Sequence, residues 1–280
     1  YAWGNTHAGA GVSTLTTPAL TGVTAVVGSR SAFAALLSTG AVVVWGDSYA
    51  GGDASAVQSE LTADIIHVVA SNAAFVAFTR SNGLVVWGYP GYGGDAAAVQ
   101  HLLNSGVKFV AHTFSAMAAV KFDGSVVTWG KPDCGGDSSA VQADLHHIVK
   151  VVGNGRAFAA LNSTGGVVAW GKPSDGGVIP ADKAAYLRSG VVSIHHTDRA
   201  FAALRSDGRV VVWGQAGHGG SPGGAVEEEL ASGVHTVCAN DAAFSAIKFN
   251  GDVVGWGHAV SIPTPGVLFN SGILTSATCA

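Results

Sequence analysis

Histidine pairs are the first feature of this 280-residue sequence that could do chemistry, because imidazole nitrogens bind zinc. The pairs are His146-His147 and His195-His196. Successive residues of a β-strand point to opposite faces of a sheet, so two adjacent histidines on a strand do not bind one ion together. His112 has the same repeat position as His196 but lies two repeats away. We therefore expect no metal site.

A serine and a run of glutamates are the other candidates for catalysis. The segment Gly219-Gly220-Ser221-Pro222-Gly223 matches the G-x-S-x-G pattern of serine hydrolases. That pattern works where a strand runs into a helix, and Pro222 disfavours a helical continuation there. Glu227, Glu228 and Glu229 are typical of the solvated face of a short helix. We expect a protein that is not an enzyme and that uses no cofactor.

The composition favours a folded chain with much buried surface. Hydrophobic residues make up 48% of the sequence and charged residues 11%, against about 25% charged in an ordinary domain. The net charge of −4, without a run of Lys or Arg, argues against nucleic acid as a direct ligand. No apolar run reaches the roughly 18 residues that cross a bilayer, so we expect no membrane insertion. Three scattered cysteines leave the redox compartment undetermined. The location is unknown, with an intracellular or organellar one favoured.

An internal repeat of about 42 residues must position all of these side chains. The dipeptide Trp-Gly occurs seven times, with successive tryptophans 41 to 43 residues apart. A phenylalanine, or Met117 in one repeat, lies 12 residues before each tryptophan from the second onwards. A fixed period in this range is typical of propellers, solenoids and arrays. The repeated tryptophans are Trp3, Trp45, Trp87, Trp129, Trp170, Trp213 and Trp256.

Each repeat contains three apolar runs, which predict three β-strands. In residues 190–214 the repeat reads GVVSIHHTDRAFAALRSDGRVVVWG. The runs are apolar at nearly every position, so we expect strands covered on both faces, as in the stacked blades of a β-propeller. Short dipeptides between the second and third runs predict tight hairpins in which both central residues take positive φ. These dipeptides are Asn82-Gly83, Asp123-Gly124, Asp207-Gly208 and Asn250-Gly251.

A glycine-rich loop follows each Trp-Gly. In three repeats it ends in Gly-Gly-Asp, at Asp53, Asp95 and Asp137, before a segment that resembles Ser-Ala-Val-Gln. Asp is a favourable helix N-cap, and Val141 and Leu145 are four residues apart on one helical face. This pattern predicts one short helical turn per repeat outside the sheet. An edge strand through the same residues is the alternative.

The predicted fold is all-β, a seven-bladed β-propeller that forms a single domain over 1–280. Seven periods of 42 residues would need about 14 residues more than the sequence has, so the last blade lacks a strand or the sequence is a piece of a longer one. A seventh blade built from both termini would close the ring. The predicted units are 22–63, 64–105, 106–146, 147–189, 190–232, 233–271, and 272–280 together with 1–21.

The repeat resembles that of the regulator of chromosome condensation family of β-propellers. The shared pattern is Asp-Gly-x-Val-x-x-Trp-Gly, a glycine-rich loop, Gly-Val-x-x-Ile and an Ala-Leu strand, and it recurs six times in register. It is similar to short-repeat members, including β-lactamase-inhibiting propellers and algal repeat proteins labelled as HERC-type. The family's usual histidine before the Ala-Leu strand is replaced by Ala-Phe, and its Gly-Gln loop by Gly-Gly-Asp. The resemblance implies a propeller with protein partners.

The variable loops are where we expect recognition, because binding residues concentrate on loops held by a rigid scaffold. One loop set follows Trp-Gly, and the other precedes the phenylalanine strand. Tyrosine, phenylalanine and arginine are enriched at interfaces and hot spots. The seven repeated tryptophans are predicted to be structural and to pack between blades. The predicted partner-binding residues are Tyr49, Tyr89, Tyr92, Phe114, Arg156, Asp175, Arg199 and His218.

These features predict a non-catalytic protein-interaction propeller that serves as an accessory or scaffold subunit of a larger assembly. The low charge fraction favours an assembly, because a free-standing surface usually displays more charged residues. One alternative is an inhibitor or regulator of an enzyme or a small GTPase that binds through the loop face. Another is a structural subunit of an organellar, photosynthetic complex.

Overall fold

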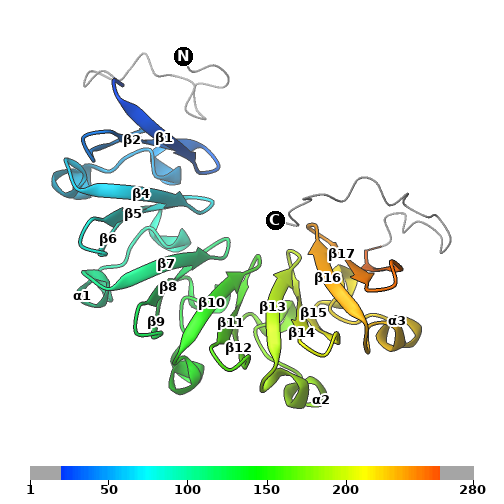
Figure 1. Ribbon diagram of the computed structural model, residues 1–280. Helices are drawn as coiled ribbons and strands as arrows, with labels where there is room; N and C mark the ends of the chain where they lie inside the picture. Colours follow the sequence, from blue (N-terminus) through cyan, green and yellow to red (C-terminus); the bar gives the residue numbers. More distant parts are fainter. Residues whose placement is uncertain (1–19, 259–280) are drawn as a thin grey trace. The chain divides into compact units, whose positions relative to one another are not determined.

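The computed structural model describes residues 20–258, in which eighteen strands form six antiparallel sheets of three strands each (Figure 1). The chain divides into two compact units, Tyr1–His147 and Ile148–Ala280, and the described part of each holds three sheets. Within every sheet the strands follow chain order, so each repeat folds as a local up-and-down unit. The predicted all-β class is confirmed.

The sheets of the first unit have nearly equal strands. They are β1 (Val23–Gly28), β2 (Ala32–Leu37) and β3 (Val42–Gly46); β4 (Ile65–Ala70), β5 (Ala74–Thr79) and β6 (Leu84–Gly88); and β7 (Val107–His112), β8 (Ala116–Lys121) and β9 (Val126–Gly130).

The second unit repeats the arrangement. Its sheets are β10 (Ile148–Gly153), β11 (Ala157–Asn162) and β12 (Val167–Gly171); β13 (Val191–His196), β14 (Ala200–Arg205) and β15 (Val210–Gly214); and β16 (Val234–Ala239), β17 (Ala243–Lys248) and β18 (Val253–Gly257).

The number of sheets corrects the seven-blade prediction. Residues 20–258 form six sheets, one in each predicted unit from 22–63 to 233–271. The segments predicted for the seventh blade, 272–280 and nearly all of 1–21, lie outside the described residues. The single domain over 1–280 stays a prediction.

The hairpins between the second and third strands form where the sequence predicts them, but their turns differ from the prediction. One residue per turn has positive φ, not two, as in a type I turn followed by a left-handed residue. That position is occupied by Asn82 in one repeat and by Gly124 in the next. The Asn82-Gly83 dipeptide is therefore one residue out of register with Asp123-Gly124, because asparagine tolerates the left-handed region that other residues avoid.

A short helical segment precedes each sheet from the second onwards and confirms the predicted turn. Within residues 20–258 the segments are η4 (Ser55–Leu61), α1 (Gln100–Leu103), η7 (Ser139–Asp144), α2 (Ala181–Ala184) with η9 (Ala185–Leu187), and α3 (Gly224–Glu229). Three of them contact the third strand of the sheet that follows: η4 contacts β6, α2 contacts β15 and α3 contacts β18. A helical segment therefore lies beside the third strand, where a four-stranded propeller blade has another strand.

The aspartates of Gly-Gly-Asp do not occupy the predicted N-cap position. The N-cap of η4 is Ala54, and Asp53 accepts the Ser55 N–H at 2.9 Å. Asp95 and Asp137 accept from residues two positions later in the same way. Each aspartate thus forms a local side-chain turn that leads into the helical segment. The Ser55 N–H lowers the pKa of the exposed Asp53 carboxyl.

The core of each unit lies between successive sheets. The middle strands are buried along almost their whole length, as in β14, where Ala200 to Leu204 are at most 7% exposed. The first strands are less buried, since on β13 Val191 is 4% exposed and Val192 is 56% exposed. The expectation of cover on both faces therefore holds for the middle strands and is wrong for the first strands, whose outward side chains face solvent.

The repeated tryptophans join one repeat to the next. Trp87, Trp129, Trp213 and Trp256 are at most 4% exposed, and each Nε1–H donates to a glycine carbonyl in the loop of the preceding repeat at 2.9 to 3.1 Å. Each also forms part of a core cluster between two sheets. Trp170 is equally buried, Trp45 is half-buried, and Trp3 lies outside the described residues.

Candidate functional site

The two variable loop sets lie side by side at one end of each sheet. The first residue after Trp-Gly donates its backbone N–H to the loop before the middle strand, as Tyr89 does to the Ala73 carbonyl at 2.9 Å. A side chain in that same loop donates back to the carbonyl 21 residues later. Ser71 reaches the Tyr92 carbonyl at 3.5 Å, and Thr113 reaches the Cys134 carbonyl at 3.0 Å. These paired hydrogen bonds hold both loops against the sheet and give them a defined surface.

The three tyrosines among the predicted partner-binding residues form one exposed surface in the first unit. Tyr49 lies in η3 (Ser48–Ala50), while Tyr89 precedes η5 (Pro90–Tyr92) and Tyr92 ends it. The Tyr49 and Tyr89 ring centroids are 6.1 Å apart with planes tilted by 56°, and those of Tyr89 and Tyr92 are 5.7 Å apart and tilted by 57°. The residues are 73%, 40% and 38% exposed. We call these three residues the tyrosine surface.

The tyrosine surface spans two successive repeats and is locally fixed. The Asp47 carboxylate accepts the Tyr49 N–H at 2.8 Å, and Pro90 restrains the backbone between the other two tyrosines. Tyrosine offers a large contact area with few rotatable bonds, so a ready-made cluster loses little conformational entropy on binding. Phe114, in the β7–β8 loop, is 44% exposed but is not part of this ring cluster.

The predicted residues of the second unit are divided between surface and interior. Arg156 and Arg199 are half-buried, and each offers its backbone carbonyl to the loop after Trp-Gly. Asp175 is 1% exposed, so it is not available to a partner, and its Oδ1 accepts from the Ser174 hydroxyl at 2.8 Å. His218 is half-buried, with its carbonyl accepting from Thr197 at 2.9 Å. The structure does not bring these four into one patch comparable with the tyrosine surface.

The histidine pairs differ from each other in position. His195 and His196 lie on β13, whereas His146 and His147 precede β10, where His147 has a φ of 54°. The expectation that both histidine pairs lie on strands is therefore wrong for His146-His147. Within residues 20–258, no three His, Cys, Asp or Glu side chains gather to hold a metal ion.

His195 contacts a serine on its own strand face. Its Nε2 lies 3.0 Å from the Ser193 hydroxyl, as expected for side chains two residues apart on a strand. Burial lowers the pKa of His195 to about 4, and the nearby positive charges of Lys150 and His196 act in the same direction. The imidazole is therefore neutral at physiological pH. The structure shows no third group that would turn this pair into a catalytic relay within the described residues.

The lowered pKa of His195 predicts a loss of stability in mild acid. Between pH 6.5 and about 4 the unfolded chain binds a proton that the folded chain does not, so the free energy of unfolding falls as the pH drops through that window. Because the ring is partly exposed, we expect a contribution of about 1 to 3 kcal/mol. Denaturant titrations at pH 7, 5.5 and 4.5 should show a smaller pH dependence in His195→Gln than in the natural sequence. Parallel curves for the two proteins would contradict this assignment.

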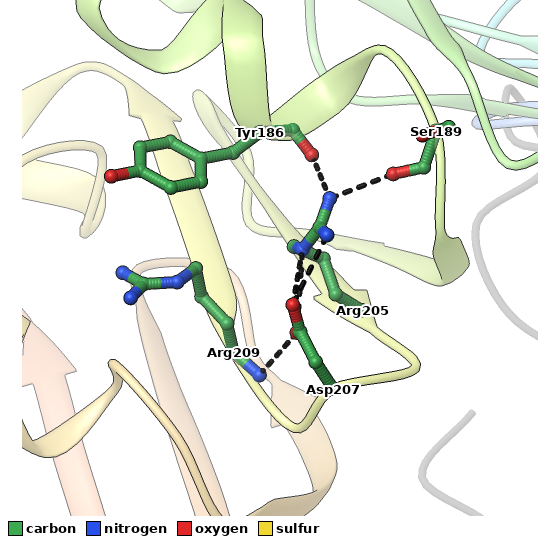
Figure 2. Close-up of polar contacts among 5 residues, drawn as sticks. All are labelled: Tyr186, Ser189, Arg205, Asp207 and Arg209. Atoms are coloured by element: carbon green, nitrogen blue, oxygen red, sulfur yellow. Dashed lines mark hydrogen bonds and ion pairs between the residues drawn. The ribbon is translucent and has the colours of Figure 1, made fainter.

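A second cluster, which the sequence does not single out, lies at the β14–β15 hairpin (Figure 2). The Arg205 guanidinium donates to the Tyr186 and Ser189 carbonyls and forms an ion pair with Asp207 at 3.1 Å. The Asp207 carboxylate also accepts the Arg209 N–H at 3.1 Å, and these hydrogen bonds lower its pKa. The guanidinium of Arg209 stacks over the Tyr186 ring, 4.8 Å from its centroid.

The helical segment of that repeat carries the one sequence signal for this cluster. It reads Ala-Asp-Lys-Ala-Ala-Tyr-Leu at 181–187, whereas three other repeats have Ala-Val-Gln at the corresponding place. Lys183 thus places a charge, and Tyr186 an aromatic ring, in the helical segment of this repeat. Lys183 and Tyr186 form a cluster only with Arg209 and Glu227, which are distant in sequence and become neighbours in the fold.

Comparisons with known proteins do not assign a family. No family model matches the sequence, and no curated protein matches it. Among solved structures, yeast RCC1 (Prp20) bound to Kap60 is 14% identical, with a TM-score of 0.49 over 84% of this chain and 70% of that chain. The ectodomain of the Arabidopsis thaliana receptor kinase ACR4 is 14% identical, with a TM-score of 0.47 over 86% and 82%. Human WBSCR16 is 19% identical, with a TM-score of 0.40 over 67% and 60%.

At these identities the neighbours assign neither a family nor a function, so membership of the regulator of chromosome condensation family stays a prediction. The evidence for a blade-like repeat is the six three-stranded sheets described above. No helix between residues 20 and 258 is both long and apolar enough to span a bilayer.

Proposed function

We propose that this chain is a non-catalytic protein-interaction module that binds a protein partner through the tyrosine surface. The observation that supports it is the contact of three exposed tyrosine rings, from two repeats, on loops fixed by paired hydrogen bonds. Large exposed aromatic groups that touch one another are typical of interface hot spots. An accessory or scaffold role in a larger assembly is the form of this function that we favour.

The regulator alternative uses the same surface. An inhibitor or GTPase regulator would insert a compact group of loop side chains into a partner's cleft, and the tyrosine surface is compact. The two roles differ in the lifetime of the complex, because a subunit stays bound through purification and a regulator dissociates. We propose the subunit role first, because the charged fraction of 11% is low for a free-standing surface. A role in a photosynthetic complex has no support from the described residues.

Site-specific cross-linking tests this proposal. With a photoreactive amino acid in place of Tyr49, we expect one dominant cross-linked protein in an extract of the cells that make this chain. Adding Tyr89→Ala and Tyr92→Ala should reduce that product at least tenfold, because loss of hot-spot aromatics costs about 2 kcal/mol or more. Phe122 is the matched control position, since it is 64% exposed at a β-hairpin outside the two loop sets.

The control separates a specific surface from general stickiness. The same photoreactive group at Phe122 should give no such product. Equal products from both positions, or a Tyr49 product unaffected by the two alanines, would sink the proposal. Copurification of the cross-linked protein without light would support a stable subunit over a transient regulator.

A further inference from the structure

The tyrosine surface presents three hydroxyl groups that the chain itself does not use. Within residues 20–258, the phenol hydroxyls of Tyr49, Tyr89 and Tyr92 form no hydrogen bond with another group of the protein. The three residues are 38% to 73% exposed, so each hydroxyl is free to donate to a bound partner. A partner that covers these rings must supply acceptors, because a hydroxyl that loses water without gaining a new hydrogen bond destabilises the complex.

The backbone of the same loops has few donors to offer. The Tyr49 N–H donates to the Asp47 carboxylate at 2.8 Å, and the Tyr92 N–H donates to the Tyr89 carbonyl at 2.9 Å. The Tyr89 N–H donates to the Ala73 carbonyl. A peptide that binds as an additional β-strand needs free N–H and C=O groups along an edge. The three tyrosines therefore provide no edge for strand addition.

The loops that carry the tyrosine surface are nearly uncharged. Of residues 47–52 and 89–94, Asp47 is the only one with a charged side chain, and its carboxylate already accepts the Tyr49 N–H. Recognition of a phosphorylated or strongly acidic segment uses clustered arginines, and these two loops contain none. What this surface offers a partner is aromatic ring area together with hydroxyl donors.

A polyproline II helix matches that chemistry. Its backbone carbonyls have no partner within the helix, so they accept hydrogen bonds from outside, whereas the carbonyls of an α-helix are already bonded internally. Proline has no N–H, so a proline-rich segment requires few acceptors from the loops. Aromatic-lined surfaces are also where proline-rich segments dock in other interaction modules.

The length of the tyrosine surface fits a short segment of this kind. The centroids of the two contacting ring pairs are 6.1 and 5.7 Å apart, so the outer rings are separated by at most about 12 Å. A polyproline II helix rises about 3.1 Å per residue and presents the same face every third residue, about 9 Å further along its axis. Two prolines in a Pro-x-x-Pro pattern can therefore contact the three rings together.

We propose that the tyrosine surface binds a proline-rich segment of a partner protein in the polyproline II conformation. The prolyl rings pack on the tyrosine rings, and the peptide carbonyls accept from the tyrosine hydroxyls. This assignment rests on the proposed function and specifies the chemistry of the partner. The preformed helix of the segment and the fixed loops of the protein both limit the conformational entropy lost on binding.

Titration of the isotope-labelled full chain with decaproline, followed by amide NMR, tests this assignment. We expect saturable shifts in residues 47–52 and 89–94, with a dissociation constant below about 1 mM. A Gly-Ser peptide of the same length has free carbonyls but neither apolar rings nor a preformed helix, so it should bind at least tenfold more weakly. Tyr89→Ala should weaken the binding of decaproline at least tenfold, because it removes the ring that contacts both others.

Replacing the three tyrosines by phenylalanine separates the rings from the hydroxyls. The variant Tyr49→Phe, Tyr89→Phe, Tyr92→Phe keeps the aromatic area and should still bind decaproline at least tenfold more weakly, because the donors are lost. Phe122→Ala is the matched control, since Phe122 is 64% exposed outside both loop sets, and it should leave the affinity unchanged. Each variant's spectrum reports whether the fold is intact. Full affinity in the phenylalanine variant, equal binding of the Gly-Ser peptide, or absence of saturable shifts would overturn the assignment.

Competition in the cross-linking experiment distinguishes the nature of the partner from the proposed function itself. Excess decaproline should abolish the product formed from position 49. A product that depends on Tyr89 and Tyr92 but persists at a saturating concentration of decaproline would overturn the proline-rich partner and leave the proposed function standing. Absence of both the cross-linked product and the saturable shifts would overturn both.

Discussion

Trp213→Ala is expected to lower the free energy of unfolding of the second unit by about 3 to 5 kcal/mol. The side chain is 1% exposed and stacks on Phe201 with ring centroids 5.3 Å apart. Its Nε1–H donates to the buried Gly176 carbonyl at 2.9 Å. The substitution therefore opens a large cavity between two sheets and leaves a carbonyl without its donor. Chemical denaturation followed by circular dichroism measures the change.

Two further variants separate the contributions of packing and hydrogen bonding. Trp213→Phe keeps most of the apolar volume but removes the donor to Gly176, so we expect an intermediate loss of about 1 to 3 kcal/mol. Phe249→Ala, at an aromatic residue that is 75% exposed, should change stability by less than about 1 kcal/mol. A loss below 1 kcal/mol for Trp213→Ala would show that the tryptophan does not hold neighbouring repeats together.

The repeat made much of the fold predictable from the sequence. Because Trp-Gly and the phenylalanine 12 residues before it recur in register, each copy supports the same three strands, and the structure pairs Phe201 directly with Trp213. The turn type was not predictable from the dipeptides alone. Asn82-Gly83 and Asp123-Gly124 look equivalent, yet the left-handed residue is the first of one pair and the second of the other.

Part of the candidate site could be predicted from the sequence, namely the residues that lie close together in the chain or at similar places in successive repeats. Tyr89 and Tyr92 are neighbours in the chain, and Tyr49 has a similar place one repeat earlier, so the period itself brings the three together. Asp175 looked like an exposed loop residue, but its carbonyl accepts from Asn154 at 2.7 Å in a buried setting. Arg209 gives no signal in the sequence, because its contact with Tyr186 depends on how the helical segment packs on β15.

The glycine of each Trp-Gly explains why that dipeptide repeats. Within the described residues its φ lies between 98° and 120° in all six copies, a region that residues with a side chain rarely adopt. A Cβ built on Gly214 would lie 2.7 Å from both the Ala200 Cα and the Arg199 carbonyl oxygen. Both contacts are with backbone, which cannot move away without disturbing the pairing of β14 with β15. The requirement is therefore steric as well as conformational.

Gly214→Ala is accordingly expected to lower the free energy of unfolding by about 3 kcal/mol or more, from backbone strain and the clash with β14 together. Gly217→Ala is the matched control three residues later, because no atom lies within 4 Å of the added Cβ and its φ is not positive. It should leave stability unchanged or raise it by up to about 1 kcal/mol through a less flexible unfolded chain. Thermal and denaturant unfolding of the two variants gives the comparison. Similar losses in both would mean that glycine at position 214 serves flexibility, and a large loss confined to Gly214→Ala would show that the close approach of the two strands requires it.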